Sequence, residues 1–244
     1  MFRHQGKTRT LSHNLKIASL LSSVAGIVNV AGFLAVQRLT TNVTGHFAFF
    51  VDEVFKLNIS EALVYFLYIF FFFAGSFVSS LLTEIISRKD DHYIYIVPAS
   101  IECIILFVIG CLEQNVAIQS PNIIAFSLLF AMGLQNSLVT TISSATVRTT
   151  HLTGLFTDLG IELSQLFFYK EQQQKARLRS SINLRLTIIS FFFIGGVAGG
   201  VLYANVQLHT LIFAAGILAL GLIYDNIKFR LILLRRRLRD RQDV

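Results

Sequence analysis

Six stretches of almost uninterrupted apolar residues constrain this chain most, because each is about as long as a bilayer is thick. They cover residues 17–36, 62–82, 93–112, 123–142, 186–205 and 206–224. In lipid, each stretch must satisfy its backbone polar groups within its own segment, which favours helices. The sequence lacks the alternating segments of about ten residues that a membrane barrel needs. We therefore expect an all-α, polytopic integral membrane protein with six transmembrane helices.

The composition also favours a membrane protein. Hydrophobic residues make up 54% of the 244 residues and charged residues only 14%, which is more apolar than a typical soluble domain. The first apolar stretch follows a basic segment, as in a signal peptide, but it is longer than the usual apolar core of about 7–15 residues. We therefore expect one integral membrane domain, residues 1–244, that keeps its first span and has the lipid bilayer as a partner.

Lysine and arginine are distributed unevenly between the two sides of the predicted bundle. With the N-terminus in the cytoplasm, only Arg38 and Lys56 of the 21 basic residues face outward. The positive-inside rule therefore places both termini in the cytoplasm. Because the net charge of +7 follows this distribution, we expect no nucleic-acid partner. The basic tail, residues 228–244, should lie against anionic headgroups.

Two motifs occur twice in the chain. Thr-Thr-Asn-Val-Thr-Gly at residues 40–45 is echoed by Thr-Thr-His-Leu-Thr-Gly at 149–154, and the Phe-rich segment at 71–80 is echoed at 191–200. We expect repeat one at about residues 15–113 and repeat two at about 121–227. Each repeat holds three predicted spans, and an odd number inverts the second repeat relative to the first, as in one class of secondary transporters.

A second topology stays open. If residues 43–57 and 152–169 also crossed the membrane, the protein would have eight spans and a parallel repeat. The first of these segments is short for a span and carries Asp52, Glu53 and Lys56, which favours six. The two Phe-rich segments are 11 residues further apart along the chain than the two Thr-Gly motifs are. The polar segment 170–180, which we interpret as a loop or surface helix, fits this excess.

The two Thr-Gly motifs predict sharp turns followed by helices. Glycine reaches backbone angles that other residues avoid, and Thr44 and Thr153 can cap the helices that follow. Two interpretations remain. Either the turns re-enter the membrane and meet near a pseudo-twofold axis, where free amides at helix starts favour an anionic or polar solute, or each turn links a span to an interfacial helix. Asp158, Glu162 and Gln165 should form one polar stripe.

Neutral amides recur in spans one and four. Gly26 and Asn29 have the same spacing as Gly133 and Asn136, and Gln135 adds a further amide. In lipid, such amides turn toward protein neighbours. They either bond to another helix or line a substrate path.

Small residues at a spacing of four occur in spans two and five. Gly75 and Ser79 are matched by Gly195 and Gly199. This spacing allows helix backbones to approach closely, either within one chain or in a homodimer.

Two ionisable residues stand near or inside predicted spans. Glu102 lies well inside the third span, where a carboxylate is costly, so it either binds a proton or substrate cation or bonds to a polar neighbour. Arg148 follows span four and either extends to the membrane surface or attracts an anionic group to the second turn.

Several functional classes have no motif in this chain. The sequence contains no Walker phosphate loop, dinucleotide fingerprint, zinc helix motif or nucleophile elbow. We therefore expect no enzyme, no catalytic residue, no cofactor and no metal site.

The repeated motifs resemble those of a known family. Gly26-x-x-Asn29, Thr44-Gly45-His46, Gly133-x-Gln135-Asn136 and Arg148-Thr149-Thr150-x-x-Thr153-Gly154 are similar to the YoaK family of bacterial inner-membrane proteins (DUF1275-type). The resemblance implies a polytopic protein of the bacterial inner membrane and no established substrate. The family more usually has Asn after the first Thr-Gly, whereas this chain has His46, which can titrate near neutral pH.

These patterns together favour a secondary transporter or permease for a small polar or anionic solute. The alternative is a non-transporting membrane scaffold or sensor whose basic cytoplasmic face recruits a partner. The expected substrate-binding residues are Asn29, Thr44, Gly45, His46, Glu102, Gln135, Asn136, Arg148, Thr149, Thr153, Gly154 and Asp158.

Overall fold

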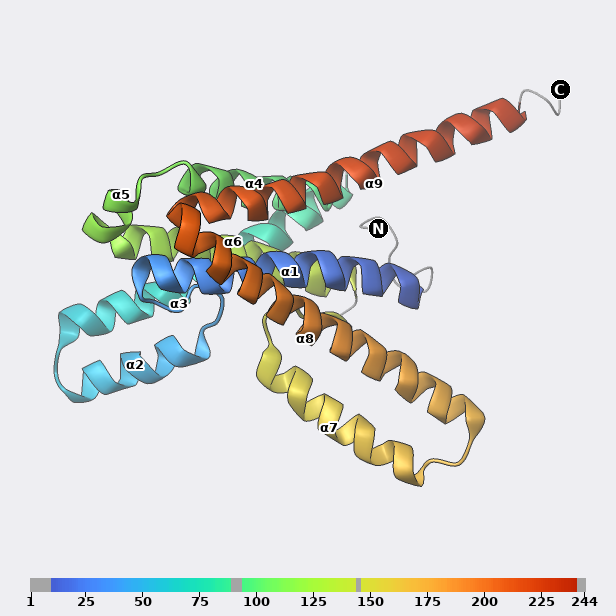
Figure 1. Ribbon diagram of the computed structural model, residues 1–244, viewed down its shortest axis with the longest axis horizontal. Coiled ribbons are helices and arrows are strands. Elements are labelled where there is room, and N and C mark those ends of the chain that lie inside the picture. The colour runs from blue at the N-terminus through green and yellow to red at the C-terminus, as the bar shows by residue number, and fades with distance from the viewer. Residues whose placement is uncertain (1–9, 89–93, 144–145, 241–244) are drawn as a thin grey trace.

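The computed structural model describes residues 10–88, 94–143 and 146–240 (Figure 1). Over these ranges the chain forms helices and no strand, which confirms the all-α prediction. The helices are α1 (Leu11–Val36), α2 (Thr44–Phe55), α3 (Ile59–Ser87), α4 (Ile96–Gly110), α5 (Gln114–Gln119), α6 (Pro121–Ile142), α7 (Leu152–Phe168), α8 (Gln172–Val206) and α9 (Thr210–Asp240), with a 3₁₀ turn, η2 (Gln207–His209), between the last two.

Four helical segments in the described ranges are long and apolar enough to cross a membrane, which supports a helical membrane protein. Three of them are α1, α3 and α6. The fourth, Gln172–Asp225, has 54 residues and combines the predicted spans 186–205 and 206–224, with η2 at the start of the second. The predicted span 93–112 corresponds to α4, which is apolar but has only 15 residues. The number of crossings, six, stays a prediction.

Two sequence predictions fall partly outside the described structure. Residue 93, the expected start of the third span, lies in an undescribed range. The side chains of the predicted basic tail, residues 228–244, also lie outside the described part of the chain.

The long helices run back and forth along the long axis of the molecule (Figure 1). α1 packs most extensively on α8 and α6 on α3, while α4 lies against α9 and α6. α2 folds back along α3 and α7 along α8, which gives two helical hairpins that project toward opposite ends of the bundle (Figure 1).

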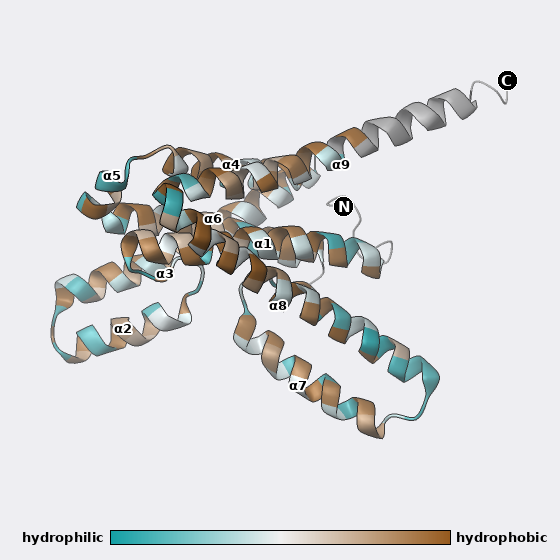
Figure 2. Cartoon of the chain, in the orientation of Figure 1, coloured by the Kyte–Doolittle hydropathy of each residue, from teal (hydrophilic) through white to brown (hydrophobic). Residues whose placement is uncertain are grey.

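Apolar residues make up much of the long helices (Figure 2). On α3 the side chains of Phe66, Phe70, Phe73 and Phe77 are all exposed, as expected for a surface that contacts lipid. Polar residues gather instead at the start of α8 and in the connection from α7 (Figure 2). Most of the polar segment 170–180 is helical, because it forms the first part of α8.

Glycines allow the two most extensive helix contacts. A methyl group added at Gly26 would lie 2.1 Å from the carbonyl oxygen of Phe192 on α8, and one added at Gly133 would lie 2.2 Å from that of Phe72 on α3. Real atoms do not approach so closely, so only glycine fits at either crossing. The repeated small residues of α3 and α8 therefore pack within the chain, while the homodimer through the same faces stays a prediction.

Candidate functional site

The first chain reversal follows α1. Gln37 has left-handed backbone angles (φ 53°, ψ 34°), which end the helix. The chain then runs back along α1: the Thr41 hydroxyl donates to the Asn29 side-chain oxygen at 2.6 Å, and the Thr40 hydroxyl donates to the Val28 carbonyl at 3.2 Å. Asn29 lies seven residues before the end of α1, a distance of about 10 Å along a helix. The reversal therefore returns along about two turns of α1.

The second reversal, after α6, makes bonds of the same form. The Thr150 hydroxyl donates to the Asn136 side-chain oxygen at 2.9 Å, six residues before the end of α6. The side-chain nitrogen of Gln135 donates to the Thr149 hydroxyl oxygen at 3.0 Å and to the Leu21 carbonyl of α1, also at 3.0 Å. These two amides were expected either to bond to another helix or to line a substrate path. Both bind the second reversal, and Gln135 also bonds to another helix, α1.

Both reversals are connected to one side of α1. Thr40 bonds to the carbonyl of Val28, and Thr149 is linked through Gln135 to the carbonyl of Leu21. Positions 21 and 28 are two helical turns apart, so they lie on the same side of the helix at a separation of about 10 Å.

The Thr-Gly pairs do not make the reversals themselves. Thr44 is the first residue of α2, and Thr153 is the second residue of α7. The residues before the helices are Val43 and His151, and no side-chain capping bond forms at either start. The prediction that the two threonines cap the helices is therefore wrong, because both already lie inside them. Both threonine side chains are exposed.

His46, in the first turn of α2, is buried. Its ring N–H at Nε2 donates to the Leu39 carbonyl at 2.6 Å, and its ring centre lies 4.6 Å from that of Tyr68. Nδ1 has no partner among the described residues. Burial lowers the pKa of His46 more than the bond to Leu39 raises it, and the charge of Arg38 lowers it further. The imidazole is therefore held neutral. Gly45 lies beside it, close to the side chain of Leu39.

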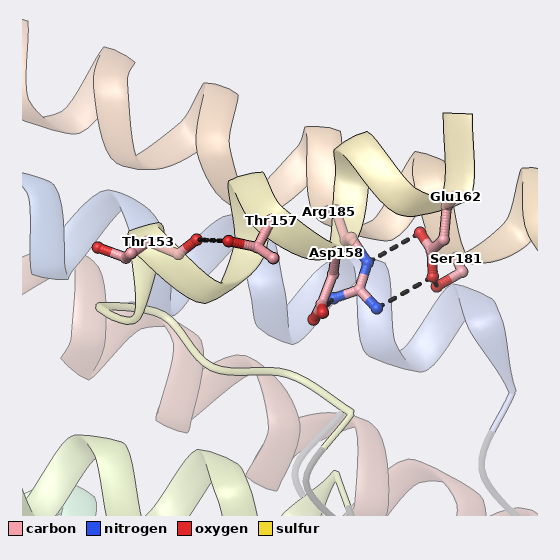
Figure 3. Close-up of polar contacts among 6 residues, drawn as sticks. All are labelled: Thr153, Thr157, Asp158, Glu162, Ser181 and Arg185. Carbon is pink, nitrogen blue, oxygen red and sulfur yellow. Dashed lines mark hydrogen bonds and ion pairs between the residues drawn. The ribbon is translucent and has the colours of Figure 1, made fainter. Parts of the chain in front are cut away.

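An arginine joins α8 to the polar stripe of α7 (Figure 3). Arg185 binds both carboxylate oxygens of Glu162, at 2.8 and 3.0 Å, and one oxygen of Asp158 at 2.9 Å. The Ser181 hydroxyl also donates to Glu162, at 2.6 Å. Burial raises the pKa of Glu162, but the bonds from Arg185 and Ser181 outweigh it and hold the pKa below its ordinary value. Two residues of the predicted stripe, Glu162 and Asp158, therefore close the α7–α8 hairpin by binding one cation.

A cavity of about 220 Å³ lies beside this ion pair. Its lining includes Arg148, His151, Gly154, Asp158 and Arg185. Arg148 makes no ion pair with any described residue, so its charge is available to a bound group. A methyl group at Gly154 would lie 2.3 Å from the His151 ring, so glycine is what allows the imidazole to occupy this position.

Glu102 lies apart from these reversals, on α4. It is 0% exposed, and neither carboxylate oxygen has a hydrogen-bond partner among the described residues. Glu102 is not among the residues that line the cavity.

The structure thus groups the predicted site residues unevenly. Arg148, Gly154 and Asp158 share one cavity, while Thr44, Gly45 and His46 lie in the first turn of α2. Sequence reasoning missed Arg185 and His151. Two acidic residues at a spacing of four, on a helix beside a span, were the available signal for Arg185, because such a pair requires a nearby cation.

Comparisons with known proteins give a family and no function. The chain is 25% identical over 185 residues to the UPF0700 transmembrane protein YoaK of Bacillus subtilis (strain 168), which covers 74% of this chain and 80% of that protein. No solved structure matches the chain. The family described as "Protein of unknown function (DUF1275)" matches residues 17–224. Because this match covers most of its length, the chain belongs to the DUF1275 family of proteins of unknown function, whose relative YoaK is named a transmembrane protein.

Proposed function

We propose that this protein is a secondary transporter or permease for a small polar or anionic solute, built from two inverted three-helix repeats. The two chain reversals and the cavity beside the second of them form the solute pathway. The observation that carries the proposal is the pair of Thr–Asn bonds, Thr41 to Asn29 and Thr150 to Asn136, which brings both reversals back along their helices.

The contacts of the two halves support the repeat, because they match position by position. Gly26 meets Phe192 and Gly196 of α8, and Gly133 meets Phe72 and Ser76 of α3. Phe72 and Ser76 lie 120 residues before Phe192 and Gly196, the same offset as the Phe-rich echo. The α2–α3 hairpin likewise matches the α7–α8 hairpin. Such repeats commonly enclose a substrate site at their interface.

The charges of the cavity favour an anionic group. Asp158 is already paired with Arg185, whereas Arg148 is unpaired within the described structure. The cavity also lies at the start of α7, where backbone N–H groups and the helix dipole favour negative charge. A carboxylate or phosphate oxygen would therefore be stabilised beside Arg148.

The proposal places the protein in the bacterial inner membrane with six crossings and both termini in the cytoplasm. The cavity at the α7–α8 hairpin then opens toward the cytoplasm, and the α2–α3 hairpin lies toward the opposite side. With no ATPase motif in the sequence, coupling would use an ion gradient.

Ligand-dependent stability tests the site. We would measure thermal unfolding of the detergent-purified protein with acetate, citrate, phosphate, sulfate and amino acids. An anion present at about 100 times its dissociation constant adds about 2.7 kcal/mol of stability if it binds only the folded state. The shift should disappear in Arg148→Gln and persist in Arg179→Gln, which removes an exposed arginine outside the cavity. A shift that survives Arg148→Gln, or no shift with any anion, contradicts the proposed anion site.

Cysteine accessibility tests the inverted arrangement. In a background with Cys103 and Cys111 replaced by alanine, single cysteines at the exposed positions Thr44 and Thr153 should react with an impermeant maleimide from opposite sides of oriented vesicles. Reaction of both from the same side rules out the inversion.

A membrane scaffold or sensor is the second candidate. The exposed polar start of α8 and its connection to α7 would then recruit a soluble protein (Figure 2). Stable co-purification of one partner, lost when residues 170–180 are replaced by a Gly/Ser sequence, would favour this candidate over transport.

A further inference from the structure

One buried carboxyl group takes no part in the pathway described above. Glu102 is 0% exposed in the middle of the apolar helix α4, and both of its oxygens lack a hydrogen-bond partner among the described residues. An ionised carboxylate in this buried position would have no counter-charge among the described residues to stabilise it.

Among the side chains that the structure describes, the helices packed against α4 offer no cation to Glu102. They are α9, α6, α3 and η2. α6 carries no ionisable side chain. The ionisable residues described on the other three are Glu61, Tyr65, Tyr68, Glu84, His209, Tyr224 and Asp225, and none of them has a hydrogen bond or ion pair with Glu102. On α4 itself, the neighbouring Cys103 donates to the Ala215 carbonyl of α9 at 3.3 Å.

Two other buried oxygen atoms without partners lie near the same depth in the bundle. The bond from Cys103 to α9 places Glu102 at the depth of residues 215–219, and the contact of Gly221 with Leu20 places Ser22 of α1 at about the same depth. Gln135 bonds to Leu21, next to Ser22. Glu102, Ser22 and Gln135 therefore lie within about one helical turn of each other in depth.

All three residues are completely buried, and each keeps at least one oxygen unbonded: both carboxylate oxygens of Glu102, the hydroxyl of Ser22 and the side-chain carbonyl of Gln135. Buried polar atoms are normally satisfied, and a buried carboxyl group without a partner avoids the cost of a buried charge by binding a proton.

We propose that Glu102 is the proton-binding site of this protein, at the depth in the bundle where Ser22 and Gln135 also bury polar oxygens. This rests on the proposed transport function and names its coupling ion. Gln135, at about the same depth as Glu102, also binds Thr149 of the second reversal.

Dicyclohexylcarbodiimide, an apolar reagent for protonated carboxyl groups, tests this site without a transport substrate. The carboxyl proton moves to a carbodiimide nitrogen, the carboxylate oxygen adds to the central carbon, and acyl migration gives a stable N-acylurea with no atoms lost. We expect one adduct on the full-length protein in lipid vesicles, mapped by peptide fragmentation to Glu102, with a rate that falls as pH rises. The water-soluble carbodiimide EDC should not modify this position.

Matched variants define the outcome. Glu102→Gln should abolish the adduct, and Glu84→Gln, at a mostly exposed carboxyl, should leave it unchanged. An unmodified Glu102, or a labelling rate independent of pH, overturns the proposal. Loss of labelling when Na⁺ replaces choline at constant pH also overturns it, in favour of a sodium site. If Glu102→Gln does not yield folded protein, the position of the adduct in the unmutated chain still decides.

The labelling result is independent of the tests of the solute site. Failure to label Glu102 leaves the Arg148 cavity and the inverted arrangement untouched. Glu102 could instead be labelled while no anion binds and both single cysteines react from the same side of the membrane. The protein would then be a proton-binding membrane protein and not the transporter proposed above.

Discussion

Thr41 donates its hydroxyl hydrogen to the side-chain oxygen of Asn29 across 2.6 Å and thereby binds the chain that leaves α1 back to the helix it has just left. Thr150 is bound to Asn136 in the same way at 2.9 Å. Deleting the only hydrogen-bond partner of a polar group costs more free energy when that group is removed from water. These bonds therefore stabilise the reversals more than exposed bonds would.

Thr41→Val and Thr150→Val should each lower the free energy of unfolding by about 1–3 kcal/mol, because each leaves an asparagine oxygen unbonded. Thermal unfolding in detergent measures the loss. Thr157→Val is the matched control, since its exposed hydroxyl bonds only to a carbonyl of its own helix. Equal effects at all three positions would show that the Thr–Asn bonds have no special role.

Gly26→Ala and Gly133→Ala should each destabilise the protein by about 1–3 kcal/mol, because the new methyl group would overlap a backbone carbonyl of the crossing helix. Gly160→Ala is the control: no atom outside its own helix lies within 4 Å of the added carbon, so helix propensity should raise stability by up to about 1 kcal/mol. The same unfolding measurement applies, and a stable Gly26→Ala variant would contradict the close crossing of α1 and α8.

The Arg185–Glu162 pair should make stability depend on pH in the acid range. α7 is not among the helices long and apolar enough to span, and the pKa of Glu162 in the folded protein lies below its ordinary value of about 4.3. Its contribution is therefore complete above about pH 4.3 and is lost as pH falls through the lower folded pKa. The stability difference between the natural chain and Glu162→Gln should shrink over that interval. A difference that stays constant down to pH 3 would mean that the pair does not titrate.

His46 should make stability fall on mild acidification. Its pKa is lowered from an ordinary value of about 6.5, mainly by burial, so the unfolded chain takes up a proton before the folded one does. Stability is complete above about pH 6.5 and decreases as pH falls toward the lower folded pKa. His46→Asn should flatten the unfolding temperature between about pH 7 and 5. The same slope in both proteins would assign it to another group.

Helices could be predicted from the sequence because lipid leaves a chain few alternatives. The segments expected at 43–57 and 152–169 are α2 and α7, and five of the six apolar stretches lie within segments of spanning length. What failed was the reversal geometry. Glycine and threonine predicted a turn at Thr44-Gly45, whereas hydrogen bonds to residues 28 and 29 of α1 fix the turn earlier, and such contacts have no local pattern.

The site was predictable only in part, for a similar reason. Arg148 was identified by its charge near a predicted turn and Asp158 by its place in a polar stripe, and both line the cavity. Arg185 sits at the edge of an apolar stretch, where a cation usually serves only to fix orientation. Its position against Asp158 and Glu162 depends on how α8 lies along α7, which the residues of either helix alone do not specify.

The packing of α1 on α8 has a consequence for biosynthesis. The ribosome must extend the chain to about residue 200 before the glycine of α1 can meet its partner backbone, so the first helix enters the membrane long before its main neighbour exists. During that time the side-chain oxygen of Asn29 can already accept the bond from Thr41, which is made soon after α1. A nascent chain arrested after α4 should therefore remain open to membrane quality-control proteases, and assembly should complete only with synthesis of α8.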